Sequence, residues 1–267
     1  MNGNQLKILA LAAMTLDHIG YILFPQVLWL RVVGRLAFPI FAFMVAEGCF
    51  YTRDKRRYLA TMCAFAAGIQ LAYWVCMHSL YQSIMTTLAL SVATVFTLQR
   101  VETCARERKG TGTIAAAMAG VAGMLAVDAL CCLALPGLLG HGFGVDYGLC
   151  GVLLPVFAYL PRLFREKAEG ENGEKGVGET DGAARKRAIG KRMRRLMLAS
   201  FAAGLVLLCV ALDRPAWHVQ WFCLLSLVPL AFYDGTRGRL RMKYLFYVYY
   251  PAHLAVLYGI GVLTGLC

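Results

Sequence analysis

The chain has 267 residues, of which 59% are hydrophobic and 16% are charged, whereas soluble domains are about half apolar and about one quarter charged. A mean hydropathy of +0.59 excludes an ordinary water-soluble domain, so the net charge of +12 indicates membrane topology and not nucleic-acid binding. Collagen-like and low-complexity chains are also excluded, because the 27 glycines and 8 prolines follow no short period.

Apolar runs fill most of the chain, and a membrane-spanning helix needs about 20 such residues. In chain order we predict nine spans, at Leu6–Phe24, Val27–Phe50, Leu59–His78, Tyr81–Leu98, Thr113–Leu135, Gly148–Tyr159, Leu196–Leu212, Trp217–Tyr233 and Tyr244–Cys267. The sixth is short and ends at Pro155 and Pro161, so it is either broken or begins earlier, near Phe143. Lipid offers no partner to backbone N–H and C=O groups, so we expect an all-α polytopic membrane bundle.

Basic residues predict how this bundle is oriented. Of the 27 Lys and Arg residues, 24 fall at Lys7 or in alternate loops, at 53–57, 100–109, 162–195 and 237–243. The remaining three are Arg31, Arg35 and Arg214. Because Lys and Arg concentrate in cytoplasmic loops, this distribution predicts a cytoplasmic N-terminus and an external C-terminus.

One segment interrupts the membrane domain. Between the bundle halves 1–161 and 196–267, residues 162–195 are rich in Gly, Glu, Lys and Arg, with almost no apolar content from Glu166 to Lys191. Such a segment cannot bury enough surface to fold alone, so we predict a disordered cytoplasmic linker. Its basic end is expected to lie against anionic lipid headgroups, which makes membrane lipids a partner, and no nucleic acid is expected.

Familiar catalytic and metal-binding motifs are absent. The chain has no P-loop, no G-x-G-x-x-G, no H-E-x-x-H and no G-x-S-x-G, which excludes the common ATPases, dehydrogenases, zincins and serine hydrolases. The ten cysteines lie mostly within apolar runs and include no C-x-x-C pair, so we expect them to pack as small hydrophobes and predict no metal.

Ionisable residues inside the predicted membrane gather in the first two spans, and such residues are costly in lipid and often functional. Asp17 and His18 lie toward the outer end of the first span, while Arg31 and Arg35 share a face of the second. The short connection makes the two helices antiparallel, so Arg35 is expected to reach Asp17, with an imidazole beside the pair. Alternatively, the pair only orients the helices, Arg31 snorkels outward, and His18 is a satisfied core histidine. Glu47 lies near the cytoplasmic edge, and we leave both roles open for it.

Two further sites carry weaker signals. Asp146 and Tyr147 open the sixth span from outside, where Asp146 is either a functional residue or a helix cap. His253 follows Pro251 in the last span, and proline kinks a helix and frees a carbonyl. That histidine therefore faces either a cavity or a neighbouring helix.

Together these residues form a pattern that resembles a known family. Leu16-Asp17-His18-Ile19-Gly20, the block Gly34-Arg35-Leu36-Ala37-Phe38-Pro39-Ile40-Phe41-Ala42-Phe43, Glu47-Gly48, Asp146-Tyr147-Gly148 and Tyr250-Pro251-Ala252-His253 are similar to motifs of the TraX family. The resemblance spans the whole chain except the linker. It implies an inner-membrane protein, related to a conjugation protein that N-acetylates pilin and, more distantly, to membrane acyltransferases.

The resemblance also implies roles for the residues. His18 maps to the candidate catalytic histidine, oriented by Asp17, and acetyl-CoA is the expected acyl donor, reached from the cytoplasm. Arg35 and Arg31 would bind CoA phosphates or stabilise an oxyanion, and Glu47, Asp146, Tyr147 and His253 are expected to contact substrate or CoA. The acceptor stays open between a pilin-like peptide, a sugar and a small molecule.

Two other classes of protein remain as alternatives. One is a non-enzymatic transporter in which Asp17, His18 and Arg35 relay protons or bind an anion. The other is a structural component of a conjugation or secretion apparatus. A transporter should have a polar pathway open to both sides and discontinuous helices in matching positions, whereas an acyltransferase should have one cavity that ends at His18.

Overall fold

The computed structural model describes residues 1–140, 142–163, 179–212, 218–238 and 245–265, and every regular element in this part of the chain is a helix. In order these are α1 (Gly3–Ile22), α2 (Leu28–Gly34), α3 (Ala37–Tyr51), α4 (Lys55–Met77), α5 (Ile84–Arg106), α6 (Thr111–Ala129), the π-helix η1 (Leu130–Ala134), α7 (Leu135–Leu139), α8 (Gly148–Leu163), α10 (Glu179–Leu212), the 3₁₀-helix η2 (His218–Ser226), α11 (Leu227–Ala231) and α12 (Leu245–Leu263). An isolated backbone bridge within these residues pairs Gln82 with Val145.

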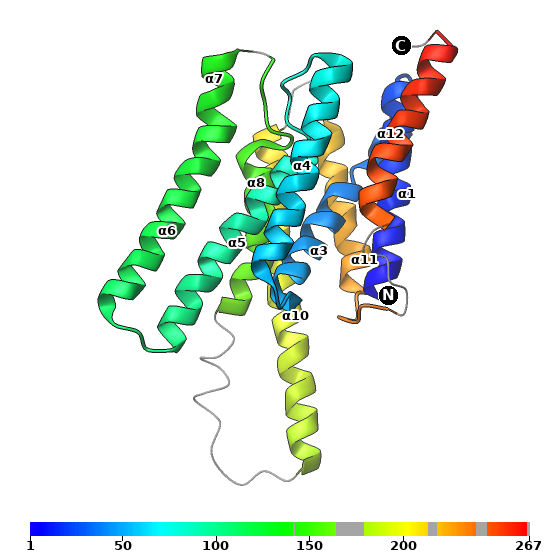
Figure 1. Ribbon diagram of the computed structural model, residues 1–267. Helices are drawn as coiled ribbons and strands as arrows, with labels where there is room; N and C mark the ends of the chain where they lie inside the picture. Colours follow the sequence, from blue (N-terminus) through cyan, green and yellow to red (C-terminus); the bar gives the residue numbers. More distant parts are fainter. Residues whose placement is uncertain (141, 164–178, 213–217, 239–244, 266–267) are drawn as a thin grey trace.

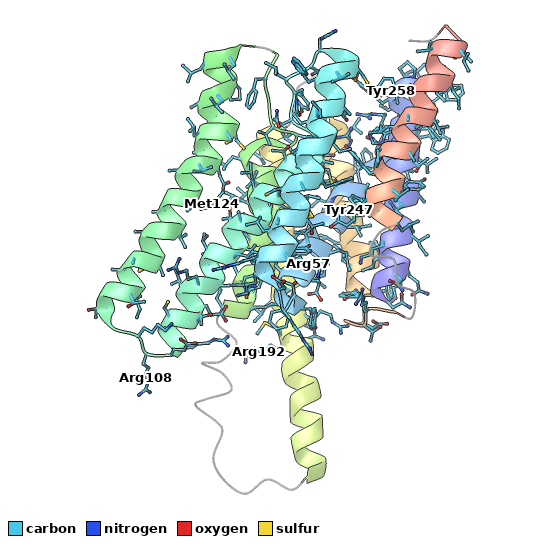
Figure 2. All side chains as sticks on the ribbon, in the orientation of Figure 1. Arg57, Arg108, Met124, Arg192, Tyr247 and Tyr258 are labelled. Carbon is cyan, nitrogen blue, oxygen red and sulfur yellow. The ribbon has the colours of Figure 1, made fainter. Side chains whose placement is uncertain are left out.

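The long helices stand side by side and run alternately up and down in one bundle, with the N-terminus at one end and the C-terminus at the other (Figure 1). Arg108 and Arg192 project at the end where α1 begins, and Arg57 lies close to the same end (Figure 2). These labelled side chains belong to the segments 53–57, 100–109 and 162–195, whose basic residues predict the cytoplasmic face.

Six stretches of helix are long and apolar enough to cross a membrane: Leu28–Tyr51, Lys55–Met77, Ile84–Arg106, Thr111–Leu139, Arg192–Leu212 and Leu245–Leu263. The apolar helices Gly148–Leu163 and His218–Ala231 are shorter, and α1 is outside the six. A multi-pass helical membrane protein is therefore confirmed, while the count of nine spans and the orientation of the N-terminus stay predictions.

The second predicted span is not one continuous helix. The predicted span Val27–Phe50 consists of two helices, because α2 ends at Gly34 and α3 begins at Ala37. Pro39 has no N–H to donate to the carbonyl of Arg35, and its ring crowds that carbonyl, so regular helix geometry is lost there. The break places Arg35 at the junction of two helical segments.

The fifth and sixth spans have other limits in the structure than those predicted. α6 continues through the π-helical turn η1 into α7, so this span runs to Leu139 and not to Leu135. Pro136 is the second residue of α7, and the π-helical turn directly precedes this helix. α8 begins at Gly148, which has a φ of +56°, and continues through Pro155 and Pro161 to Leu163. The alternative of an earlier start near Phe143 is therefore wrong.

The predicted linker 162–195 overlaps two helices. Residues 164–178 lie outside the described residues, whereas Arg162 belongs to α8 and α10 begins at Glu179. Residues 183–199 are mostly Ala, Arg, Lys, Leu and Met, which are strong helix formers, so the helix of the seventh span extends well before Leu196. Arg162, which we counted among the cytoplasmic loop charges, is instead a buried residue of the bundle.

The core lies between α1, α3, α5, α8 and α10, where Leu6, Phe43, Val92, Leu154 and Phe201 are almost fully buried. α6 is different, because its only buried residues are Ala117 and Asp128. Its exposed apolar side chains suit contact with lipid, and in Figure 1 it lies at the edge of the bundle beside α5.

Candidate functional site

Close contact between α1 and α2 builds the centre of the candidate site. A Cβ added to Gly34 would lie 2.3 Å from both Cβ and Oδ1 of Asp17, and one added to Gly20 would lie 2.8 Å from Cβ of Leu30. Only glycine permits such an approach of the two backbones. The Asp17 carboxylate is therefore pressed against α2, at the level of its two arginines.

Asp17 pairs with both arginines. Arg31 Nη1 donates to Asp17 Oδ2 at 2.9 Å and to the Asp17 carbonyl at 3.3 Å, while Arg35 Nη2 lies 3.6 Å from Oδ1. The side chains of Asp17, Arg31 and Arg35 are 19%, 26% and 16% exposed, so the group is only partly withdrawn from its surroundings. Two guanidinium groups face one carboxylate, which leaves this cluster with an excess of positive charge.

Gln220, from η2, completes the cluster and was missed by the sequence reasoning. Its Oε1 accepts from Arg35 Nη1 at 3.3 Å. Arg35 Nε and Gln220 Nε2 are both buried and have no hydrogen-bond partner among the described residues. Buried donors are normally satisfied, so two open donors beside surplus positive charge suit a ligand that carries acceptor oxygens.

His18 meets His253, which comes from the other end of the chain. Nε2 of His253 lies 3.2 Å from Nδ1 of His18, and the ring centroids are 4.9 Å apart. Nδ1 of His18 is also 2.9 Å from the carbonyl of Met14, and Nδ1 of His253 is 2.9 Å from the carbonyl of Tyr249. Asp17 forms no hydrogen bond with His18, so the expected orienting role of Asp17 passes to Met14 and His253.

These contacts assign the protons when both rings are neutral. A carbonyl oxygen only accepts, so Nδ1 carries the hydrogen in His18 and also in His253. Nε2 of His253 must then accept from Nδ1–H of His18. Nε2 of His18 is left with a lone pair and has no partner in the part of the chain that the structure describes. His18 is only partly buried, so this nitrogen is suited to take a proton from an incoming group.

Asp146 and Tyr147 lie in the connection before α8 and interact electrostatically with Arg35. Tyr81 donates to Asp146 Oδ1 at 3.3 Å, and the Tyr147 ring stacks on Phe38 at 4.0 Å. Burial raises the pKa of Asp146 to about 6, although the positive charge of Arg35 and the Tyr81 hydroxyl favour the carboxylate. The structure therefore brings Asp146 into the electrostatic surroundings of the cluster.

Glu47 lies apart from this group. Its carboxylate forms an ion pair with Arg162 and accepts from the Tyr233 hydroxyl at 3.3 Å, while the Arg162 guanidinium lies 4.1 Å from the Phe50 ring centre. Glu47 and Arg162 are 5% and 7% exposed. The pair joins α3 to α8 and has the features of a structural contact.

The sequence reasoning also missed a buried carboxyl on α6. Asp128 is fully buried and accepts from the Thr94 hydroxyl at 2.7 Å. Along the same face of α5, Ser91 donates to the Val152 carbonyl at 2.7 Å, and Thr87 donates to the Asp146 carbonyl at 2.6 Å. The sequence offered a signal for this site: Asp128 is a lone acid within an apolar run. A second run has the hydroxyl residues Thr87, Ser91 and Thr94 at helical spacing.

A helical bundle with six helices of membrane-spanning length and with charged groups paired in its interior defines a multi-pass membrane protein. The model of the family described as TraX protein matches residues 2–169, which is more than half of the chain, so the chain belongs to the TraX family. That match includes His18 and the cluster on α1 and α2, whereas Gln220 and His253 lie beyond it.

Two relatives extend the comparison. The chain is 26% identical to a probable fimbrial assembly protein FimC, serogroup H1, of Dichelobacter nodosus, over 95% of this chain and 93% of the relative. It is 46% identical to an uncharacterised protein of Rickettsia prowazekii (strain Madrid E), over 52 residues that make up 20% of this chain and 21% of that one. No solved structure matches the chain.

Proposed function

We propose that this protein is an integral membrane acetyltransferase that moves an acetyl group from acetyl-CoA to an amine or hydroxyl acceptor. Membership of the TraX family supports the proposal. The observation that carries it is His18, whose Nε2 lone pair is open while its Nδ1–H is held by two acceptors, close in sequence to the two-arginine cluster on α1 and α2.

In the proposed reaction His18 is the general base. As the lone pair of the acceptor nitrogen or oxygen attacks the thioester carbonyl carbon, His18 Nε2 takes the proton of the acceptor. The C–S bond then breaks, and the departing CoA thiolate recovers that proton from the imidazolium. The products are the acetylated acceptor and CoA, and no oxidant, reductant or metal enters the balance.

The cluster around Arg35 would hold the negatively charged parts of the reaction. Arg31, Arg35 and the open amide of Gln220 are suited to CoA phosphates or to the oxyanion that develops on the thioester. Asp146 and Tyr147 lie around Arg35 and are our candidates for contacts that position the substrate. We assign Glu47 a structural role, because Arg162 and Tyr233 already occupy its carboxylate.

The donor would reach the site from the cytoplasm. Three basic side chains support this orientation, because Arg57, Arg108 and Arg192 lie at the end of the bundle where α1 begins and would attract a phosphate-bearing donor (Figure 2). We accordingly propose nine spans, a cytoplasmic N-terminus and a place in the bacterial cell membrane.

The name of the Dichelobacter relative favours a fimbrial context, so a pilin-like peptide with a free amino terminus is our first acceptor to test. The same name supports a second candidate function, in which the protein is a non-enzymatic component of fimbrial assembly. In that case the polar cluster would only join helices, and acetyl-CoA would not react.

The two functions are separated by radiolabelled acetyl transfer with the purified full-length protein in lipid. Acetyl-CoA is supplied with a peptide that has a free amino terminus, with the same peptide blocked, or with a sugar. We expect label in one acceptor and at least about 10²-fold loss in His18→Asn, because a general base contributes that much or more. His78→Asn, at an exposed histidine, is the matched control and should retain the rate. If label appears in no acceptor, or if His18→Asn matches the wild type, the enzyme proposal is wrong.

A further inference from the structure

α12 is fixed against α1 by contacts that lead directly to the two histidines. The Tyr249 hydroxyl lies 2.6 Å from the Thr15 hydroxyl, one turn of α1 before His18. On its other side, Tyr247 contacts α4, where its hydroxyl is 3.7 Å from Met62 Sδ and its ring lies 4.9 Å from that of Phe65 (Figure 2). These contacts set the height of α12 on the bundle, and therefore the height of His253.

The orientation of the His253 ring is also restrained by its neighbours. It stacks on the Tyr249 ring, with centroids 5.2 Å apart and an angle of 12° between the planes, and it meets the Tyr250 ring edge-on at 5.7 Å. His253 is 8% exposed. A ring packed in this way has one available orientation, in which Nε2 points at His18.

Both nitrogens of His253 are already committed. Nδ1–H donates to the Tyr249 carbonyl at 2.9 Å, and Nε2 accepts from His18. No lone pair and no N–H of this ring remains for a substrate. His253 therefore acts on the reaction through His18.

We propose that His253 is a positioning residue for His18, and this inference rests on the proposed function. Its Nε2 lone pair holds the proton of His18 on Nδ1 and so keeps the Nε2 lone pair of His18 turned toward the acceptor. When His18 takes the proton of the acceptor, the positive charge that forms is shared by the bond from Nδ1–H to His253. A neutral histidine thus takes the place that a carboxylate occupies beside other catalytic histidines.

Two substitutions separate positioning from packing and from substrate binding. His253→Phe keeps a ring against Tyr249 but has no acceptor, so we expect kcat to fall roughly 10- to 100-fold with KM for acetyl-CoA unchanged. His253→Gln can place an amide oxygen where Nε2 was, and it should restore most of kcat. His78→Phe, at an exposed histidine, is the matched control and should leave both constants unchanged. A rise in KM with kcat unchanged would make His253 a ligand contact and overturn the proposal, as would wild-type kinetics in His253→Phe.

A measurement without turnover tests the same bond. The chain has only five histidines, so ¹⁵N-histidine labelling gives a spectrum in lipid with few signals. We expect a correlation between His18 Nδ1–H and His253 Nε2, and its loss in His253→Phe. If the correlation is present and no acetyl transfer occurs, the histidine pair stands and the enzyme proposal fails. If transfer occurs and both histidines carry their protons on Nε2 with no correlation, the positioning role fails alone.

Discussion

Two ion-pair networks among the described helices differ in charge balance and in exposure. The pair Glu47–Arg162 is one-to-one, and its carboxylate is fully used by the guanidinium and by Tyr233. The open cluster of Asp17, Arg31 and Arg35 has two cations for one anion and is more exposed. Buried donors without a hydrogen-bond partner among the described residues occur in both networks, at Arg162 Nη1 in the closed pair and at Arg35 Nε in the open cluster. The comparison teaches that a charge inside a membrane protein has a structural role where one buried counter-ion balances it, and is available to a ligand where charge is in excess and partly exposed.

The largest stability effect is expected at the closed pair. Arg162→Met leaves the Glu47 carboxylate buried without its cation, which we expect to lower the free energy of unfolding by about 3–5 kcal/mol. The double variant Glu47→Leu/Arg162→Met removes both charges and should recover most of that loss. Thermal unfolding in one detergent compares the three proteins. If Arg162→Met unfolds like the wild type, the pair is not the structural contact that we describe.

Substitutions in the open cluster should change KM or kcat for acetyl-CoA more than the free energy of unfolding. A hydrogen bond to a charged group contributes about 1.5–3 kcal/mol, so Arg35→Gln should raise KM for acetyl-CoA roughly 10- to 100-fold. Acetyl-pantetheine, which lacks the nucleotide phosphates, distinguishes two roles. If Arg35 binds a phosphate, Arg35→Gln and the wild type should have the same KM for acetyl-pantetheine. If Arg35 stabilises the oxyanion, Arg35→Gln should instead have a lower kcat than the wild type with both donors. If Arg35→Gln leaves kcat and KM unchanged with both donors, the cluster is not part of the site.

The contact that places Asp17 can be broken through the backbone. Gly34→Ala puts a methyl group 2.3 Å from the Asp17 Cβ, so α1 and α2 must separate, at a cost of about 1–3 kcal/mol. Gly120→Ala on α6 is the control, since its added methyl meets no atom within 4 Å. Thermal unfolding should show a loss for the first variant and none for the second, and equal values would mean that this close approach contributes nothing.

The smallest expected effect is a pH dependence from Asp146. Its pKa is raised by burial from 3.8 to about 6, so the folded protein binds this proton more tightly than the unfolded chain does. The contribution of Asp146 therefore favours folding below about pH 4, declines as pH rises to about 6, and is constant above. Unfolding temperatures from pH 4 to 8 should show a decline in the wild type relative to Asp146→Asn. Parallel curves would contradict the shift.

The parts of the fold that depend on long runs of apolar residues could be predicted from the sequence. The six helices of membrane-spanning length, the helical class and the family follow from composition and motifs. The break at Arg35 could have been predicted, because Pro39 lies four residues later and removes its hydrogen-bond partner. The start of α10 was not predicted, because the many charged residues before Leu196 indicated a linker although Ala, Arg and Lys also favour a helix.

The site was predictable only within one pair of neighbouring helices. The short connection after α1 made the approach of Asp17 to Arg35 foreseeable, and the structure brings the two together. The partners of His18 and Arg35 could not be foreseen, since His253 and Gln220 come from helices more than 180 residues away along the chain. Contacts between residues so far apart in the sequence depend on which helices pack together. The spacing of residues within one helix does not predict this packing.

The central claim is that chemistry occurs at His18, next to Asp17 of the open cluster, and not at the closed pair. The most direct test is the initial rate of thiol release from acetyl-CoA in the presence of the acceptor, per folded molecule and below the unfolding temperature of every variant. We predict that His18→Asn unfolds like the wild type and loses at least about 10²-fold in rate, whereas Glu47→Gln unfolds earlier and keeps its rate within a few-fold. The reverse pattern, with the rate lost in Glu47→Gln and retained in His18→Asn, would contradict the account.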